Sequence, residues 1–267
     1  MRYSEKLTAR IHAVSSHLCV GLDPRPDLIQ EPLKEFLLRV IAESAPHAAC
    51  FKPNIAYFEA LGSRGIALME EILTAIPRGI PILLDAKRSD IGETQKYYAR
   101  AVFETWGVDA VTLNPFLGYD SIEPFLGYEG KGLYLLAVTS NPGAADIEKQ
   151  RLADGRRVFE LVGDMARRAA GSPADVGFVV GLTNADPDIL PVLPDAPLLV
   201  PGLGAQGGDV NALRGSGRRA PVLINVSRGV LFPAEGETVA GAAEKWRAMI
   251  ETALESRLQA ESSSQVA

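Results

Sequence analysis

The chain has 267 residues, of which 47% are hydrophobic and 22% are charged, a composition typical of globular proteins. Its formal net charge of −6 argues against a nucleic-acid binder, which is usually basic, but allows a local basic pocket for a small anion. No apolar stretch approaches the roughly 18 residues of a membrane span, and the N-terminus lacks the apolar core of a signal peptide. We therefore expect a soluble, cytoplasmic protein.

The cysteines and histidines are few and are not arranged for chemistry. Cys19 and Cys50 both lie in apolar runs, which indicates buried, reduced thiols rather than a disulfide framework. His12, His17 and His47 have no metal-ligand spacing, so neither a zinc site nor a catalytic histidine is expected. The sequence therefore predicts no metal and no cofactor.

Short apolar runs alternate with longer amphipathic stretches along the whole chain. The N-terminal residues 1–14 have helical periodicity, and the apolar runs predict strands at 18–22, 48–51, 80–87, 110–113, 133–138, 176–180, 198–200 and 222–226. Helical spacing predicts helices at 31–43, 66–76, 93–106, 120–128 and 156–170, short helices near 187–190 and before 213, and a closing helix at 237–258.

Eight strands, each followed by a helix or helical turn, predict one α/β domain. Alternation of this kind favours parallel pairing with right-handed crossovers, and eight units in about 250 residues favour a closed (β/α)8 barrel, or TIM barrel. A doubly wound open sheet is the alternative, but its Gly-rich turn normally follows the first strand, whereas here it comes late. We assign residues 1–259 to the barrel with its N-terminal helix, and expect the polar tail 260–267 to be disordered.

Charged residues gather where the first three predicted strands end. An apolar run leads into Asp85, Lys87 and Asp90, while Asp23 and Lys52 end the first and second strands. Residues i and i+2 of a strand share a face, and adjacent strand ends lie about 5 Å apart, so a chain of alternating charges is geometrically possible. A structural ion pair is the alternative, but an inward-facing charged pair is costly unless it is functional. Because barrel enzymes carry their active sites at this end, we favour a catalytic cluster.

A second signal comes from the loops after the seventh and eighth strands. The loop 201–208 is rich in glycine, including Gly204 and Gly207, and the loop 225–229 contains Arg228. Barrels often bind phosphate with these two loops, because glycines let backbone N–H groups approach the oxygens and arginine binds two of them. The sequence thus predicts a phosphorylated substrate whose reacting centre lies over strands one to three.

The motif D-A-K-R-S-D-I-G-E-T at 85–94 resembles the D-x-K-x-x-D signature of orotidine 5′-monophosphate decarboxylases. The resemblance extends over nearly the whole chain, through G-L-D-P, F-K-P-N, T-S-N-P-G, P-G-L-G-A-Q-G-G and S-R-G at successive strand ends. The chain length and extra loops resemble the bacterial branch with longer chains, the type 2 subfamily. The resemblance implies cofactor-free and metal-free decarboxylation of orotidine 5′-monophosphate to uridine 5′-monophosphate and CO2, the last step of de novo pyrimidine biosynthesis.

The same resemblance implies roles for the charged cluster. Lys87 would be the general acid that protonates carbon 6 of the pyrimidine, and Asp85 would lie against the substrate carboxylate. Lys52 and Asp23 would bind the ribose hydroxyls and hold the chain of charges in place.

Further roles carried by the resemblance concern a partner subunit and the two ends of the substrate. Asp90, Ile91 and Thr94 match residues that the family contributes to the partner's site, so a homodimer with shared sites is implied. Ser140 matches the family residue that hydrogen-bonds the pyrimidine. Gln206 and Arg228 match the residues that bind the phosphate, and the loop around Gln206 would close over the ligand.

Three other functions remain open on this sequence. A magnesium-dependent sugar-phosphate decarboxylase shares the barrel and the D-x-K-x-x-D motif, but the Gln206 loop and the Ser140 region favour a pyrimidine substrate. A Schiff-base aldolase would use Lys87 as a nucleophile, which the neighbouring acids disfavour. A non-catalytic barrel that binds a phosphorylated metabolite would keep the late glycine-rich loop but would not need the charged cluster.

Overall fold

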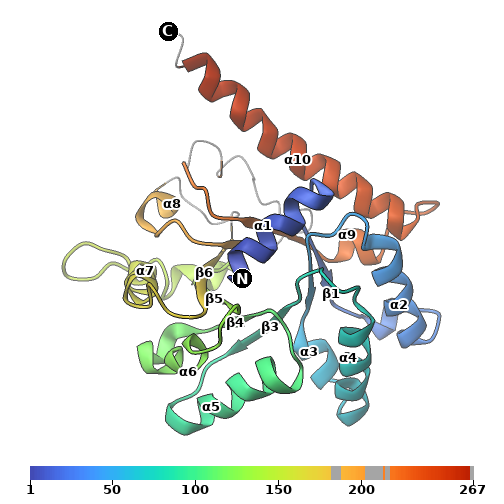
Figure 1. The fold of residues 1–267 in the computed structure, drawn as a ribbon, viewed down its shortest axis with the longest axis horizontal. Helices are drawn as coiled ribbons and strands as arrows, with labels where there is room; N and C mark the ends of the chain where they lie inside the picture. The colour runs from blue at the N-terminus through green and yellow to red at the C-terminus, as the bar shows by residue number, and fades with distance from the viewer. Residues whose placement is uncertain (182–187, 202–212, 214–216, 265–267) are drawn as a thin grey trace.

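The fold is a parallel barrel, seen in a computed structural model that describes residues 1–181, 188–201, 213 and 217–264, with side chains as far as Leu254. Eight strands form one parallel sheet in the order β2-β1-β8-β7-β6-β5-β4-β3. The isolated bridges Phe51–Ile82 and Asn54–Asp85 join β2 to β3 and close the ring. The predicted (β/α)8 barrel is therefore confirmed (Figure 1). The strands are β1 Leu18–Leu22, β2 Cys50–Pro53, β3 Leu83–Arg88, β4 Ala110–Leu113, β5 Gly132–Val138, β6 Asp175–Val180, β7 Leu198–Val200 and β8 Val222–Val226.

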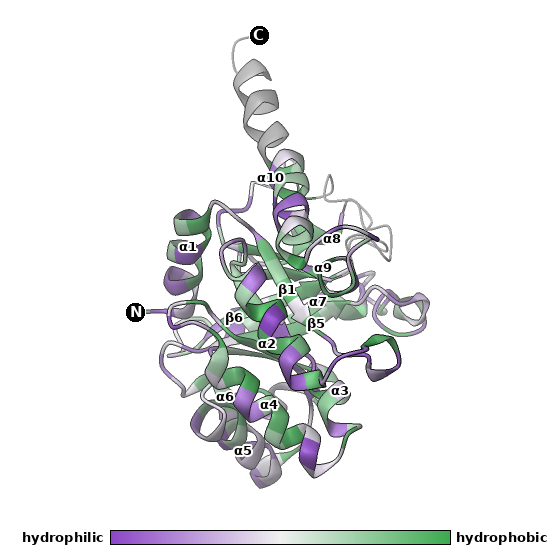
Figure 2. Ribbon diagram, turned by 90° about the vertical axis from the view of Figure 1, so that its right-hand side faces the viewer, coloured by the Kyte–Doolittle hydropathy of each residue, from purple (hydrophilic) through white to green (hydrophobic). Residues whose placement is uncertain are grey.

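Most of the helices pack around the outside of this ring. In Figure 2 the strands are mainly hydrophobic, while the helices carry both hydrophobic and hydrophilic residues, as expected of helices that bury one face. In α2 the buried face consists of Phe36, Leu37, Val40, Ile41 and Ser44. The helices are α1 Tyr3–Val14, α2 Leu33–Ser44, α3 Ile55–Glu59, α4 Ser63–Ala75, α5 Gly92–Arg100, α6 Glu123–Leu126, α7 Val158–Arg168, α8 Ile189–Val192, α9 Arg228–Leu231 and α10 Val239–Ser264.

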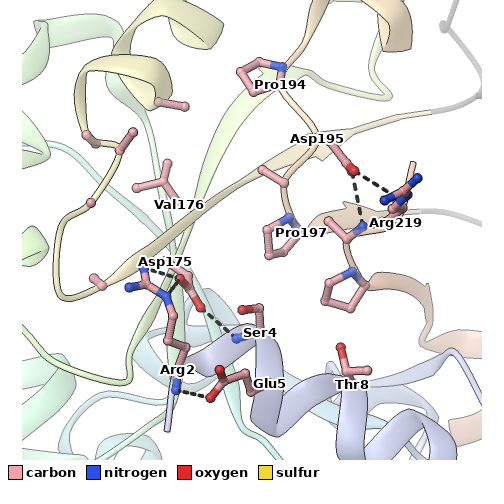
Figure 3. A pocket seen from close by; sticks show the side chains of 18 of the residues that line it. Arg2, Ser4, Glu5, Thr8, Asp175, Val176, Pro194, Asp195, Pro197 and Arg219 are labelled. Carbon is pink, nitrogen blue, oxygen red and sulfur yellow. Dashed lines mark hydrogen bonds and ion pairs between the residues drawn. The ribbon is translucent and has the colours of Figure 1, made fainter. Parts of the chain in front are cut away.

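The first helix closes the amino-terminal end of the barrel, in front of the strands in Figure 1. Its start is held by Asp175 at the beginning of β6, whose carboxylate accepts hydrogen bonds from Arg2 Nε at 2.6 Å and Ser4 N at 2.8 Å (Figure 3). We call this end the floor of the barrel. The buried side chains that meet there are Tyr3, Leu7 and Ile11 of α1 and Cys19, Ala49, Cys50, Leu83, Ala110, Tyr134, Val179, Leu199 and Leu223 of the strands and their approaches.

Several element boundaries differ from those predicted. Strand β3 begins at Leu83 rather than at residue 80, and α5 ends at Arg100 and continues as a π-helical turn over Ala101–Thr105. The last helix, α10, continues to Ser264, beyond the predicted end at 258 and into the stretch assigned to the tail, since Gln, Ala and Glu at 259–261 are good helix formers. Residues 265–267 lie outside the described residues, and disorder of the tail stays a prediction.

No helix within the described ranges combines the length and the apolar character that a membrane span requires. The predicted short helix before Leu213 falls almost entirely on residues that the structure does not describe.

Candidate active site

The carboxylate of Asp85 lies at the centre of the charged cluster. Lys52 Nζ, from β2, donates a hydrogen bond to Asp85 Oδ2 at 3.0 Å, and Lys87 Nζ donates to Oδ1 at 2.6 Å. Lys52 and Asp85 are buried, with 4% and 9% of their surface exposed, whereas half of the Lys87 side chain reaches solvent. Asp85 and Lys87 thus lie side by side, as the sequence led us to expect, and the cluster runs from the barrel interior to its opening.

The two buried members of the cluster stabilise each other in their charged forms. Burial alone would raise the pKa of Asp85, but the positive charges of Lys52 and Lys87 outweigh it and hold that pKa well below its usual range. Burial likewise acts to lower the pKa of Lys52, but the negative charges of Asp85 and Asp23 outweigh it and hold this pKa well above its usual range. At neutral pH the buried pair is therefore a carboxylate and an ammonium.

A bulge in β3 sets the position of these groups. The pairing with β4 matches Leu84 with Val111 and Arg88 with Leu113, so three residues of β3 lie opposite Thr112 alone. Within the bulge, Lys87 has a φ of 46°, in the left-handed region that non-glycine residues rarely adopt. The bulge therefore gives Asp85 and Lys87 a geometry that a regular strand would not.

Thr112 is a site residue that the sequence reasoning missed. Its Oγ1 donates a hydrogen bond to Asp85 Oδ1 at 2.9 Å and accepts the backbone N–H groups of Ala86 at 3.0 Å and Lys87 at 2.9 Å. A signal was available, because Thr112 follows the inward-facing Ala110 by two residues and so shares its face of the strand. Thr112 is therefore a polar residue at an inward position one layer above the floor, which places it beside the charged cluster.

The other strand ends present the remaining predicted residues at the same end of the barrel. Asp23 follows β1, and its buried Oδ1 has no hydrogen-bond partner among the described residues. Such an oxygen is costly to bury unless a ligand or water binds it. Ser140 follows β5 in close contact with β6, since a Cβ on Gly181 would come within 2.7 Å of Ser140 Cα. Arg228 is the exposed first residue of α9, directly after β8.

Asp90, Ile91 and Thr94 are not part of the cluster within one chain. The Asp90 carboxylate accepts the N–H of Ile91 at 2.8 Å, Ile91 is 60% exposed, and Thr94 is exposed on α5. Among the described residues, none of the three forms a hydrogen bond or ion pair with Asp85 or Lys87. The continuous chain of charges considered from the sequence therefore ends at Lys87, because β3 ends at Arg88 and the chain turns into α5.

The predicted phosphate-binding residues of the seventh loop, Gly204, Gln206 and Gly207, lie outside the described residues. Of the residues predicted to bind phosphate, the structure describes Arg228.

A hollow of about 960 Å³ also lies at the opposite, amino-terminal end, between α1, α7 and the segments that enter β6 to β8 (Figure 3). Its acidic groups already have partners, because Asp175 binds Arg2 and Ser4, and Asp195 accepts the backbone N–H groups of Arg219 at 2.9 Å and Ala220 at 3.2 Å. We therefore place the candidate active site at the carboxyl ends of the strands.

Known proteins similar to this chain include orotidine 5′-phosphate decarboxylases from several organisms. The orotidine 5′-phosphate decarboxylase of Roseiflexus castenholzii is 40% identical over 272 residues, covering 97% of this chain and all of that protein. That of Haloarcula marismortui is 43% identical over 248 residues, covering 88% of each chain. Among solved structures, Leishmania donovani OMP decarboxylase has a TM-score of 0.81 and 35% identity, covering 95% of this chain and 98% of that one. The model of the orotidine 5′-phosphate decarboxylase / HUMPS family matches residues 16–243, and this chain belongs to that family.

Proposed function

We propose that this protein decarboxylates orotidine 5′-monophosphate to uridine 5′-monophosphate and CO2, the last step of de novo pyrimidine biosynthesis, without a cofactor. The observation that carries the proposal is the Asp85 carboxylate shared between Lys52 and Lys87 at the open end of a barrel of this family. The relatives named for this activity, each at least 40% identical, favour it over the magnesium-dependent sugar-phosphate decarboxylase.

Lys87 acts as the proton donor in this proposal. When the bond between carbon 6 and the carboxylate breaks, its electron pair stays on carbon 6 in the ring plane, where the pyrimidine carbonyls delocalise it poorly. The fixed ammonium stabilises this charge and then transfers one proton to carbon 6, leaving a neutral amine that solvent reprotonates. The half-exposed side chain of Lys87, bound to Asp85 at its tip, suits a group that must meet both substrate and water.

The other residues bind and orient the substrate. Asp85 faces the departing carboxylate, while Lys52 and Asp23 bind the ribose hydroxyls. The buried Oδ1 of Asp23 supports this role, since it has no hydrogen-bond partner within the described part of the chain and a hydroxyl would satisfy it. Phosphate binding, remote from carbon 6, supplies energy that lowers the barrier to reaction. The groups assigned to the pyrimidine and the phosphate are Ser140 for the ring and Gly204, Gln206, Gly207 and Arg228 for the phosphate.

The active form in this proposal is a homodimer in which Asp90, Ile91 and Thr94 complete the partner's site. Exposed apolar side chains near these residues support an interface, namely Ile91 and Tyr97 at α5 and Phe116 after the neighbouring strand β4. The protein acts in the cytoplasm, which agrees with the unpaired, buried Cys19 and Cys50.

The activity is tested by following the loss of orotidine 5′-monophosphate absorbance on adding the protein, with and without a chelator. We expect turnover that the chelator leaves unchanged. Turnover that requires magnesium would favour the sugar-phosphate decarboxylase class, and absence of turnover would refute the proposal.

Shared sites are tested by mixing two inactive variants, Lys87→Ala and Asp90→Asn. A hybrid dimer has one site with both native residues, so random mixing should restore about a quarter of wild-type activity. Two variants that stay inactive after subunit exchange, or Asp90→Asn with wild-type activity, would exclude sharing through Asp90.

A further inference from the structure

The hydroxyl of Thr112 has three partners, and all of them belong to the segment that carries the catalytic pair. It donates to Asp85 Oδ1 at 2.9 Å and accepts the N–H groups of Ala86 and Lys87 at 3.0 and 2.9 Å. A hydroxyl has one proton and two lone pairs, so its hydrogen-bonding capacity is fully used. With 1% of its surface exposed, Thr112 also has no access to solvent. It therefore does not bind substrate but can fix the groups that do.

These bonds replace the backbone ladder that a regular parallel pair would form. In such a pair, successive N–H groups of one strand point to opposite neighbours. Here two successive N–H groups, those of Ala86 and Lys87, point to the same oxygen on β4, and backbone pairing resumes only where Asn114 N donates to Arg88 O at 3.0 Å. A single side-chain oxygen thus supports the whole width of the bulge.

The bulge contains a backbone conformation that its residue type disfavours. A non-glycine residue in the left-handed region is strained and persists only where its surroundings impose that conformation. Lys87, with a φ of 46°, has this conformation, and its N–H is held by Thr112 while its Nζ is held by Asp85. Because Thr112 also binds the same Oδ1 atom of Asp85, one hydroxyl fixes the strained backbone and the carboxylate at once.

We propose that Thr112 is a positioning residue for the reaction: its hydroxyl imposes the bulged conformation that places the Lys87 ammonium against the Asp85 carboxylate and over the reacting carbon. This inference rests on the proposed role of Lys87 as proton donor. Displacement of a reacting group by about 1 Å can cost about a hundredfold in rate. Phosphate and ribose contacts come from other strands, so ligand affinity should depend little on Thr112.

The test compares Thr112→Val, which keeps the shape but removes the hydroxyl, with Thr112→Ser, which keeps the hydroxyl. For Thr112→Val we expect kcat to fall about a hundredfold, while KM and the dissociation constant of uridine 5′-monophosphate change less than about threefold. Thr112→Ser should restore kcat to within about tenfold of the wild type. Thr74→Val serves as the matched control, because the exposed Thr74 donates its hydroxyl to the Glu71 carbonyl within α4, and loss of this bond should leave kcat unchanged.

A second readout does not depend on activity. Amide hydrogen exchange at Ala86 and Lys87 should be faster in Thr112→Val than in Thr112→Ser, since only the first variant loses their acceptor. If Thr112→Val does not fold, the same measurements are made on Thr112→Ala, which leaves room for the backbone to relax.

The outcomes separate this inference from the proposed function. A wild-type protein without decarboxylase activity would refute the proposed function and with it the inference. An active wild type whose Thr112→Val variant keeps its kcat, or loses kcat and ligand affinity equally without rescue by serine, would overturn the inference alone.

Discussion

The floor and the open end of this barrel are built from the same strands, only two residues apart. On the floor, the inward-facing side chains of the first four strands are apolar or thiol groups, and α1 covers them. Because side chains alternate along a strand, the next inward positions lie one layer higher. They hold a glycine, two opposite charges and a hydroxyl: Gly21, Lys52, Asp85 and Thr112 in place of Cys19, Cys50, Leu83 and Ala110. The floor contributes apolar burial, whereas the layer above it holds the candidate active site, whose buried charges need partners to remain charged.

The largest expected effect comes from removing the ammonium at the top of this layer. Lys87→Ala should lower kcat by about 10⁴-fold or more, because both charge stabilisation and proton transfer are lost. The thermal midpoint should stay close to that of the wild type, since half of the Lys87 side chain is already exposed. Single-turnover kinetics and thermal unfolding measure the two quantities.

Lys34→Ala is the control for this variant, because Lys34 is an exposed lysine of α2 and should contribute nothing to turnover. If Lys87→Ala turned over within tenfold of Lys34→Ala, Lys87 would not be the proton donor.

Two neighbouring inward positions of β3 test the division between floor and active layer directly. Leu83→Ala should cost about 2–5 kcal/mol of unfolding free energy through the cavity it leaves, with kcat per folded molecule retained. Asp85→Asn should cost about 3 kcal/mol of unfolding free energy, because Lys52 stays buried without its charged partner, and should lower kcat as well. Urea unfolding combined with kcat measures both. A large change in kcat for Leu83→Ala would show that the two layers are not independent.

Replacing the buried pair, Lys52 and Asp85, by apolar residues would make this layer as apolar as the floor below it. The double variant Lys52→Met, Asp85→Leu should be inactive, yet its stability at pH 7 should be equal to or up to about 4 kcal/mol above the wild type, because paired charges are costly to bury. The double variant has neither titrating group. The pH dependence of the difference in unfolding free energy between it and the wild type therefore reports the titration of Lys52 and Asp85. Urea unfolding at a series of pH values measures this difference.

The sign of this pH dependence follows from the two pKa shifts. The depressed pKa of Asp85 gives the wild type stability that is present above the unfolded value, about 3.9, and is lost as pH falls through the folded value. The raised pKa of Lys52 gives stability that is present below about 10.4 and is lost as pH rises further. The difference in unfolding free energy between the wild type and the double variant should be constant from about pH 5 to 9. Below and above this range the wild type should become less stable relative to the double variant. A slope near neutral pH would contradict the charged pair.

The smallest expected effect concerns the loop after β5. Glu148 accepts the Thr139 N–H at 2.7 Å on Oε2 and the Thr139 hydroxyl at 2.8 Å on Oε1, directly before Ser140. Glu148→Gln weakens this contact, since hydrogen bonds to a charged acceptor are the stronger ones, and should lower kcat/KM about tenfold through the position of Ser140. Glu129→Gln, on an exposed turn, is the matched control. Equal kcat/KM values for the two variants would remove Glu148 from the site.

The sequence predicted the barrel and most of the strand ends because apolar runs that stop at a charge or at proline mark where a strand leaves the core. It did not reveal the bulge, which depends on how β3 pairs with β4. Thr112 escaped notice for a related reason: threonine is a common strand residue, so its identity alone does not distinguish an inward hydroxyl from an ordinary one. Spacing along the sequence also cannot show that β3 ends at Arg88 and the chain then turns into α5, which separates Asp90 from Lys87 within one chain. The contribution of Asp90 to a partner's site stays a prediction.

The charged cluster also helps to join β2 to β3. The other neighbouring strands form ladders of paired residues, with a register shift between β3 and β4 and another between β5 and β6, whereas among the described residues β2 and β3 are joined by isolated bridges at Phe51–Ile82 and Asn54–Asp85. The ion pair of Lys52 and Asp85 crosses the same joint. A ligand that binds these two charges therefore also bridges β2 and β3 where their pairing is least continuous. We expect ligand binding to disfavour transient separation of these two strands.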